Sequence, residues 1–234
     1  MSEIYDRIVR ELTKPSERDR QRKVGPSELG DLCERCLAEK LLGVHVEEKT
    51  YPLAPMIGTA FHLYLETTLG LEDYLKETRV TVGEIEGYGA IRGTADGFDL
   101  RSGHVVDYKV LSKKKIKAFS SATFFNTEQE PEFYSDSLTE GQLKKYYYQT
   151  QLYGLGMENA GYGVNHTSLI LFPRDATIES VTTATHELCF KYNREAALAV
   201  LERANEIFKW ATDNPDNLGE LDSHPGCYYC AFKR

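Results

Sequence analysis

The chain of 234 residues contains no apolar run long enough to cross a membrane, no internal repeat and no low-complexity tract. A membrane-spanning helix needs about 20 consecutive, mostly apolar residues, so the sequence predicts none. The N-terminal segment MSEIYDRIVRELTK is too charged for a secretory signal peptide. We therefore expect a cytoplasmic protein without a membrane partner, of a length that fits a single domain.

Net positive charge is also missing, because 28 lysines and arginines stand against 36 acidic residues and the formal net charge is −8. This balance is unusual for a protein that binds nucleic acid, but binding depends on local patches rather than on net charge. One basic patch follows Lys109 and consists of Lys113, Lys114, Lys115 and Lys117. These lysines could form an ordinary solvated face. If these lysines lie beside a bound metal ion, contact with nucleic-acid phosphates is the better interpretation.

Cysteine is scarce, but four of the five cysteines form two C-x-x-C pairs near opposite ends of the chain: Cys33 with Cys36, and Cys227 with Cys230. A reducing compartment disfavours disulfides and favours metal ligation. Together the pairs supply four thiolates, the set required by a zinc ion or an iron–sulfur cluster. Chance is one alternative, and a thioredoxin-like motif, which lacks its βαβ context here, is the other. Cys189 stands apart, and we expect it to be a buried thiol.

The apolar periodicity predicts both helices and strands. Helices are expected at 2–13, within 29–42, and at 55–76, 138–157 and 188–213. A three-stranded meander is expected over 78–111, a buried strand over 168–173 and a more exposed strand over 176–185. Residues 112–137 show no clear periodicity. We predict one α/β (α+β) domain with a mixed central sheet flanked by helices. Its N-terminal helical part is 1–54, its core is 55–213 and its tail is 214–234.

The residues with the clearest chemistry lie in the meander. Asp107 and Lys109 are two apart in a strand, so their side chains project to the same side. Asp96, in the preceding strand, can pair across the hairpin with this position. Two carboxylates and the backbone carbonyl of Tyr108 suit Mg²⁺ or Mn²⁺, which prefer oxygen ligands. The alternative is an exposed strand pair that carries a salt bridge.

Three residues on predicted helices could complete such a centre. His62 lies one turn after Gly58, so the glycine permits close packing while the histidine faces a metal; it could instead be a packing residue. Gln149 and Tyr153 are also one helical turn apart and could hold the lysine and a DNA phosphate from one side. The alternative for Tyr153 is a core aromatic.

Taken together, these residues resemble the PD-(D/E)XK nuclease superfamily, in particular the RecB-like exonucleases of the CRISPR-associated iron–sulfur type, including stand-alone phage versions. The resemblance extends from about Ser27 to Cys230. In that family an upstream histidine, a first acid, a D/E-x-K motif and a Q-x-x-x-Y helix form the active site. The matching positions are, in the family's order, His62, Asp96, Asp107, Lys109, Gln149 and Tyr153.

The resemblance implies a restriction-endonuclease-like fold, Mg²⁺ or Mn²⁺ at the active site, and a structural 4Fe–4S cluster on Cys33, Cys36, Cys227 and Cys230. The cluster would join the N-terminal helices to the tail. The family usually presents one N-terminal cysteine and three near the C-terminus, whereas this chain has two and two. Zinc therefore remains an alternative metal for these thiolates.

The implied activity is a metal-dependent DNA exonuclease that acts on single-stranded ends, in recombination, repair or CRISPR-related processing. The lysines at 113–117 and the aromatic residues of 118–134 would grip the strand by charge and stacking. A non-enzymatic DNA-binding or adaptor subunit with a nuclease-like fold is the alternative. A third possibility is a subunit that cuts only in complex with recombination or CRISPR-adaptation proteins.

Overall fold

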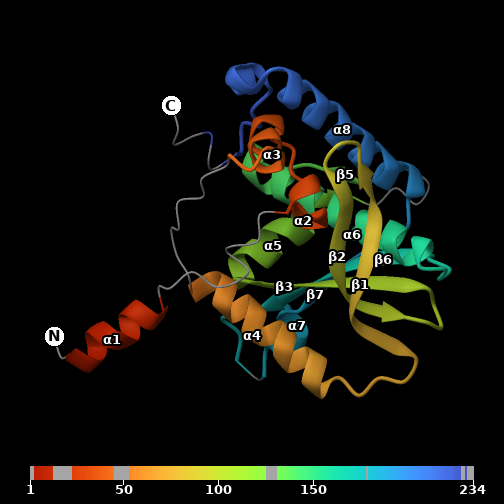
Figure 1. Cartoon of the computed structure of the whole chain (residues 1–234). Helices are drawn as coiled ribbons and strands as arrows, with labels where there is room; N and C mark the ends of the chain where they lie inside the picture. The colour runs from red at the N-terminus through yellow and green to blue at the C-terminus, as the bar shows by residue number, and fades with distance from the viewer. Residues whose placement is uncertain are drawn as a thin grey trace.

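The computed structural model describes residues 3–12, 23–44, 53–124, 131–177, 179–227 and 230. Its centre is a mixed five-stranded sheet with the order β1-β2-β3-β6-β7 (Figure 1). The strands are β1 (Tyr74–Ile85), β2 (Gly89–Asp99), β3 (His104–Leu111), β6 (His166–Pro173) and β7 (His186–Lys191). β3 and β6 are parallel, and the other neighbours are antiparallel. The predicted mixed sheet and its meander are confirmed.

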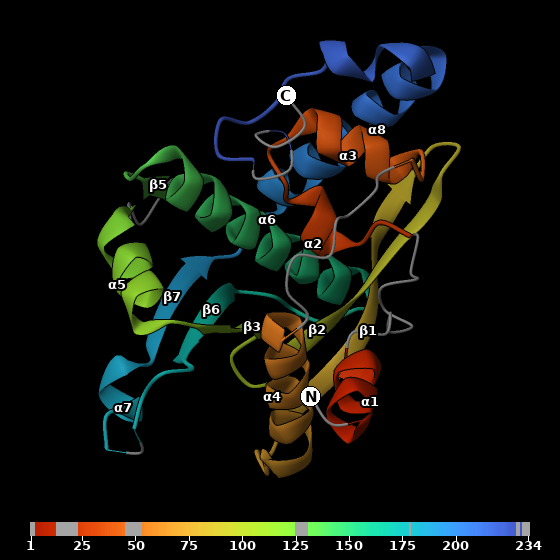
Figure 2. The ribbon, with the colours of Figure 1, turned by 90° about the vertical axis from the view of Figure 1, so that its left-hand side faces the viewer.

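Helices lie on both faces of this sheet. The described helices are α1 (Glu3–Leu12), α2 (Pro26–Leu29), α3 (Glu34–Leu41), α4 (Leu53–Thr68), α5 (Lys113–Ala122), α6 (Ser137–Asn159), α7 (Val181–Ala184) and α8 (Arg194–Asp213). A 3₁₀ helix at Pro215–Glu220 and a small hairpin of β4 (Thr123–Phe124) and β5 (Glu132–Phe133) complete the described elements. α6 and α8 lie on one side of the sheet and α4 on the other (Figures 1 and 2). Within the described ranges, no helix has the length and apolar character needed to cross a membrane.

Alternation along β3 separates its side chains into two layers. Tyr108 faces α4, where its ring packs against Phe172 of β6, and Phe172 in turn contacts Phe61 of α4. Asp107 and Lys109 face the opposite way, toward α6. The motif therefore lies on the face that α6 covers.

The position of α6 depends on local sequence at two places. Asp136 caps its first turn, because the carboxylate accepts from the backbone amides of Leu138 and Thr139. Further along, a Cβ at Gly156 would lie 2.6 Å from a methyl carbon of Val80. The glycine lets α6 approach the sheet closely, which brings its polar side chains within reach of β3.

Several predicted boundaries were wrong. The helix predicted over 55–76 ends at Thr68, because β1 begins at Tyr74 and pairs with the end of β2. The described part of 176–185 contains the helix α7 and no strand. The strand of this region is β7, which follows that segment. β7 includes the first residues of the helix predicted at 188–213, which begins only at Arg194, after the cap provided by Asn193.

Two further differences concern side chains. The segment 112–137, in which no periodicity was recognised, contains α5, with Ile116, Phe119 and Ala122 buried along one face. Cys189 is exposed rather than buried. It alternates on β7 with Leu188 and Phe190, which face the core, so its own side chain points away from it.

Candidate active site

The site forms where β2 and β3 cease to pair. Their ladder covers only Gly97–Asp99 against His104–Val106. Just beyond it, the backbone amide of Tyr108 donates to Asp96 Oδ2 over 2.7 Å, so a carboxylate takes the place of a backbone acceptor. This contact places the Asp96 carboxylate against the backbone of the D-x-K motif.

Asp107 is the most buried of the acidic groups in the site, with 1% of its surface exposed. Lys109 Nζ lies 2.6 Å from Asp107 Oδ2, and Gln149 Nε2 donates to Asp107 Oδ1 over 2.9 Å. The same amide nitrogen lies 3.3 Å from the hydroxyl oxygen of Tyr153. The structure thus brings the D-x-K and Q-x-x-x-Y residues into contact.

Burial and mutual attraction set the pKa values of Asp107 and Lys109. Burial raises the pKa of Asp107 to about 6, although the Lys109 ammonium opposes that shift. Burial alone would lower the pKa of Lys109, but the Asp107 carboxylate raises it above its usual range, so the lysine remains protonated. The ammonium also lies 5.0 Å from the ring centroid of Tyr146. This cation–π contact fixes the direction in which the lysine points.

His62 reaches the same region from α4. Its Nδ1 lies 3.2 Å from Asp96 Oδ1, and the hydrogen bond to this carboxylate raises the pKa of the imidazole. Glu66, one turn later, is exposed. Glu77 of β1, which the sequence did not indicate, places its Oε1 3.6 Å from His62 Nδ1. It belongs to no motif and precedes the strand predicted to begin at 78, so no signal in the sequence distinguished it.

The residues present fit a divalent cation. Asp107 Oδ2 is buried and, among the described residues, has an ion-pair contact with Lys109 but no aligned hydrogen-bond donor. Asp96 Oδ1, Glu77 Oε1 and a nitrogen of His62 all lie within 4.8 Å of one another. Carboxylate oxygens with one imidazole suit Mg²⁺ or Mn²⁺. The carbonyl of Tyr108 remains a predicted ligand.

The predicted DNA-contacting lysines occupy the first turns of α5, directly after β3. Lys114 and Lys117 are exposed. Lys113 is half-buried and donates to Ser180 Oγ over 3.2 Å. Lys115 is also half-buried, and burial lowers its pKa. Two of the four lysines are therefore exposed on the helix that follows the D-x-K strand.

The aromatic residues expected to stack on bases have different environments. Phe119 and Phe133 are buried in the core around α5 and α6, so the expectation of stacking was wrong for both. Tyr134 is exposed. The side chain of Phe124 and all of Phe125 lie outside the described residues.

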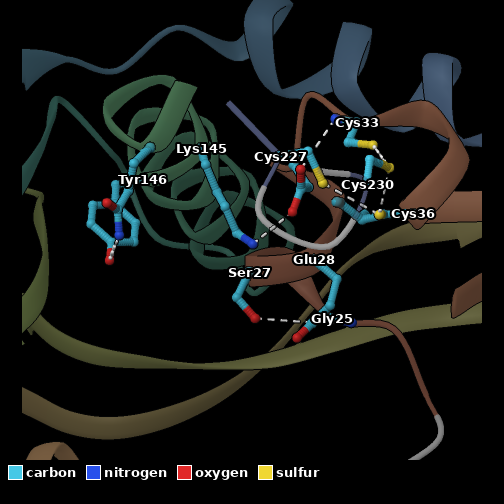
Figure 3. Close-up of polar contacts among 12 residues, drawn as sticks. Gly25, Ser27, Glu28, Cys33, Cys36, Lys145, Tyr146, Cys227 and Cys230 are labelled. Atoms are coloured by element: carbon cyan, nitrogen blue, oxygen red, sulfur yellow. Dashed lines mark hydrogen bonds and ion pairs between the residues drawn. The ribbon is translucent and has the colours of Figure 1, made fainter. Parts of the chain in front are cut away.

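The four predicted cysteines converge (Figure 3). Cys33 Sγ lies 3.4 Å from Cys230 Sγ, and Cys36 Sγ lies 3.5 Å from Cys227 Sγ and 3.6 Å from Cys230 Sγ. Donation by the Cys36 thiol and by nearby backbone amides lowers the pKa of Cys33. This arrangement joins the N-terminal helices to the tail, as predicted, and offers four sulfur ligands within 4.8 Å of one another.

The segment before the first cysteine is also tied to α6. Lys145 Nζ donates to Asp31 Oδ2 over 2.9 Å, and Asp31 Oδ1 accepts from the amide of Cys33 over 3.1 Å. Arg203 of α8 donates to the carbonyl of Leu29. A Cβ at Gly30 would lie 2.5 Å from a backbone carbonyl oxygen of α6. The cysteine site therefore packs onto the helix that carries the glutamine of the active site.

No protein-family model and no curated protein matches the chain. Its fold is similar to that of the alkaline exonuclease LHK-Exo from Laribacter hongkongensis, with 11% identity and a TM-score of 0.51 over 86% of this chain and 93% of that one. A protein from Eubacterium rectale, described provisionally as an exonuclease, has 15% identity and a TM-score of 0.51 over 94% of this chain and 91% of its own. At these identities the likeness establishes a shared fold.

Proposed function

We propose that the chain is a metal-dependent DNA exonuclease of the PD-(D/E)XK type. The observation that carries the proposal is the buried carboxylate of Asp107, held between Lys109 and Gln149 and placed beside Asp96 by the Tyr108 amide. The two solved structures of similar fold are described as exonucleases, which supports the same class of activity for this chain.

The chain's own residues account for the steps of phosphodiester hydrolysis. A Mg²⁺ or Mn²⁺ ion held by Asp96, Asp107 and His62 would polarise the phosphate and lower the pKa of a water molecule. Lys109 remains protonated, so it orients the attacking water and stabilises the negative charge that develops on the phosphate. Gln149 donates to Asp107 Oδ1 and so keeps this carboxylate in the orientation that the ion requires.

The proposed substrate is single-stranded DNA with a free end. Lys114 and Lys117 are exposed beside the site and would contact phosphates of the strand. Tyr134, also exposed, is available for stacking on a base. The corresponding cellular role would be recombination, repair or CRISPR-related processing of DNA ends, alone or with partner proteins.

We further propose that the cysteine site holds a single zinc ion. With Zn–S bonds of about 2.3 Å, tetrahedral geometry separates neighbouring sulfurs by about 3.8 Å, close to the 3.4–3.6 Å that separates three of the sulfur pairs in the structure. In a 4Fe–4S cluster each thiolate binds a different iron, so the body of the cluster keeps the sulfurs further apart. The family resemblance favours iron–sulfur, whereas the sulfur spacing favours zinc. Metal analysis of anaerobically purified protein distinguishes one zinc from about four irons per chain.

Cleavage of end-labelled linear and circular single-stranded DNA in Mn²⁺ tests the activity. We expect the linear strand to be degraded and the circle to survive. Asp107→Asn and Lys109→Met should abolish degradation, whereas the control Glu84→Gln, at an exposed position on β1, should not. Retained cleavage by Asp107→Asn would refute the proposed site. DNA binding without cleavage by the wild-type protein would instead favour an adaptor subunit.

A further inference from the structure

Glu77 is a carboxylate near the site that no motif of the sequence includes. Its Oε1 lies 3.6 Å from His62 Nδ1, and Asp96 Oδ1 approaches the same nitrogen to 3.2 Å. The three potential ligand atoms come from β1, α4 and β2, and all lie within 4.8 Å of one another. Asp107, whose oxygens contact Lys109 and Gln149, lies outside this group of three and is a separate proposed ligand of the same ion.

The backbone at Glu77 is also unusual. Its φ is 45°, in the left-handed region that costs a residue with a Cβ about 1 kcal/mol or more. On either side of it, Lys76 pairs with Gly97 and Thr78 pairs with Ala95, but no pair joins Glu77 to Asp96. The ladder, which also shifts register between Thr81 and Gly83, therefore loses a pair at the residue whose carboxylate reaches His62. Strained backbone of this kind persists where the surrounding structure holds it, and it concentrates at functional sites.

The charged groups around Glu77 favour a positively charged partner for its carboxylate. Within the described residues, His62 is the only positively chargeable group at ion-pair distance from Glu77. Lys76, its neighbour in β1, donates instead to backbone carbonyls at the end of α4. The carboxylates of Glu77 and Asp96 thus share one imidazole, and a divalent cation would neutralise both.

We propose that Glu77 is a further ligand of the active-site cation and acts with His62 and Asp96. The inference rests on the proposed function, since it concerns the cation of that same site. It adds a carboxylate oxygen from β1 close to that of Asp96. With an imidazole nitrogen in the set, Mn²⁺ should bind more tightly than Mg²⁺.

Direct binding of Mn²⁺ to the full-length protein without DNA tests this role independently of cleavage. Electron paramagnetic resonance of free Mn²⁺, or calorimetry, measures the affinity. We expect Glu77→Gln to weaken binding at least about tenfold, whereas Glu84→Gln, which alters an exposed acid on the same strand, should bind as the wild type does. Unchanged affinity in Glu77→Gln would overturn the proposal.

The variant Glu77→Gly distinguishes a role of Glu77 as a metal ligand from a purely structural role. Glycine adopts a φ of 45° without the Cβ penalty, so this variant should unfold at a urea concentration at least as high as the wild type, yet it should lose Mn²⁺ affinity as Glu77→Gln does. A Glu77→Gly protein that binds Mn²⁺ normally would also overturn the proposal.

Failure of the proposed nuclease activity would give a different experimental result from failure of the Glu77 proposal. If the wild type binds Mn²⁺ through Glu77 but leaves linear single-stranded DNA intact, the cation site stands and the proposed activity falls. If the wild type binds no Mn²⁺, the role of Glu77 is refuted, and the cleavage assay of Asp107→Asn decides the activity separately.

Discussion

Replacing Cys227 and Cys230 should remove the metal cross-link that joins the two ends of the chain. Cys33 and Cys230 are 197 residues apart in sequence, yet their sulfurs are 3.4 Å apart. A metal bound to both closes that loop in the unfolded chain as well as in the folded one. The chain-entropy relation for a loop of this length gives about 5 kcal/mol at 25 °C, and strain or residual structure reduces it. The single variant Cys230→Ser should lose less, since the Cys36–Cys227 contact still joins the two ends.

Urea unfolding under reducing conditions measures this effect. The double variant Cys227→Ser/Cys230→Ser should lose its bound metal and up to about 5 kcal/mol of unfolding free energy, a large share of the 5–15 kcal/mol typical of a domain. Cys189→Ser, at an exposed cysteine outside the cluster, is the matched control and should unfold as the wild type does. If the double variant and the wild type have the same urea midpoint and the same metal content, the cross-link argument is wrong.

Three further outcomes follow from contacts of α6 and of the segment before the first cysteine. Gly30→Ala should cost about 1–3 kcal/mol, because its Cβ would lie 2.5 Å from a carbonyl oxygen of α6; Gly219→Ala, with open space around it, should be neutral in the same urea assay. Asp136→Ala should lower the urea midpoint at pH 7, since hydrogen bonds from the Thr139 amide and hydroxyl lower the pKa of the wild-type carboxyl below 3.8. A depressed pKa means stabilisation that is present above pH 3.8 and lost as the pH falls through the folded value, so the two proteins should converge in acid. Gln149→Met, close in volume, should slow cleavage by about 10–100-fold, because Asp107 Oδ1 loses its amide donor; an unchanged rate would deny the glutamine a positioning role.

Short-range patterns predicted which polar side chains of the candidate site lie close together. In a strand, Asp107 and Lys109 must project to the same side, and on a helix Gln149 and Tyr153 must lie one turn apart. The structure places these pairs in contact. The convergence of the cysteine pairs was likewise indicated by their number and type, although spacing alone did not distinguish zinc from iron–sulfur.

Long-range geometry accounts for what the sequence missed. Glu77 joins the site because an irregular backbone at one position of β1 lies opposite Asp96, and no local pattern encodes that juxtaposition. Cys189 was expected to be buried from the usual behaviour of cysteine, but alternation on β7 decides its side. The strand predicted at 176–185 was rich in β-branched residues, yet the described part of that segment has no sheet partner and β7 pairs with β6 instead.

The hydrogen bond from the Tyr108 amide to Asp96 Oδ2 has a consequence for hydrogen exchange. Most amides in a sheet are protected by backbone carbonyls, so their exchange reports the opening of a strand. Protection at Tyr108 depends instead on one side chain, and Asp96→Ala should accelerate exchange there while the amides of β3 that pair with β6 remain protected. A single amide proton thereby becomes a spectroscopic reporter of the first carboxylate in the site.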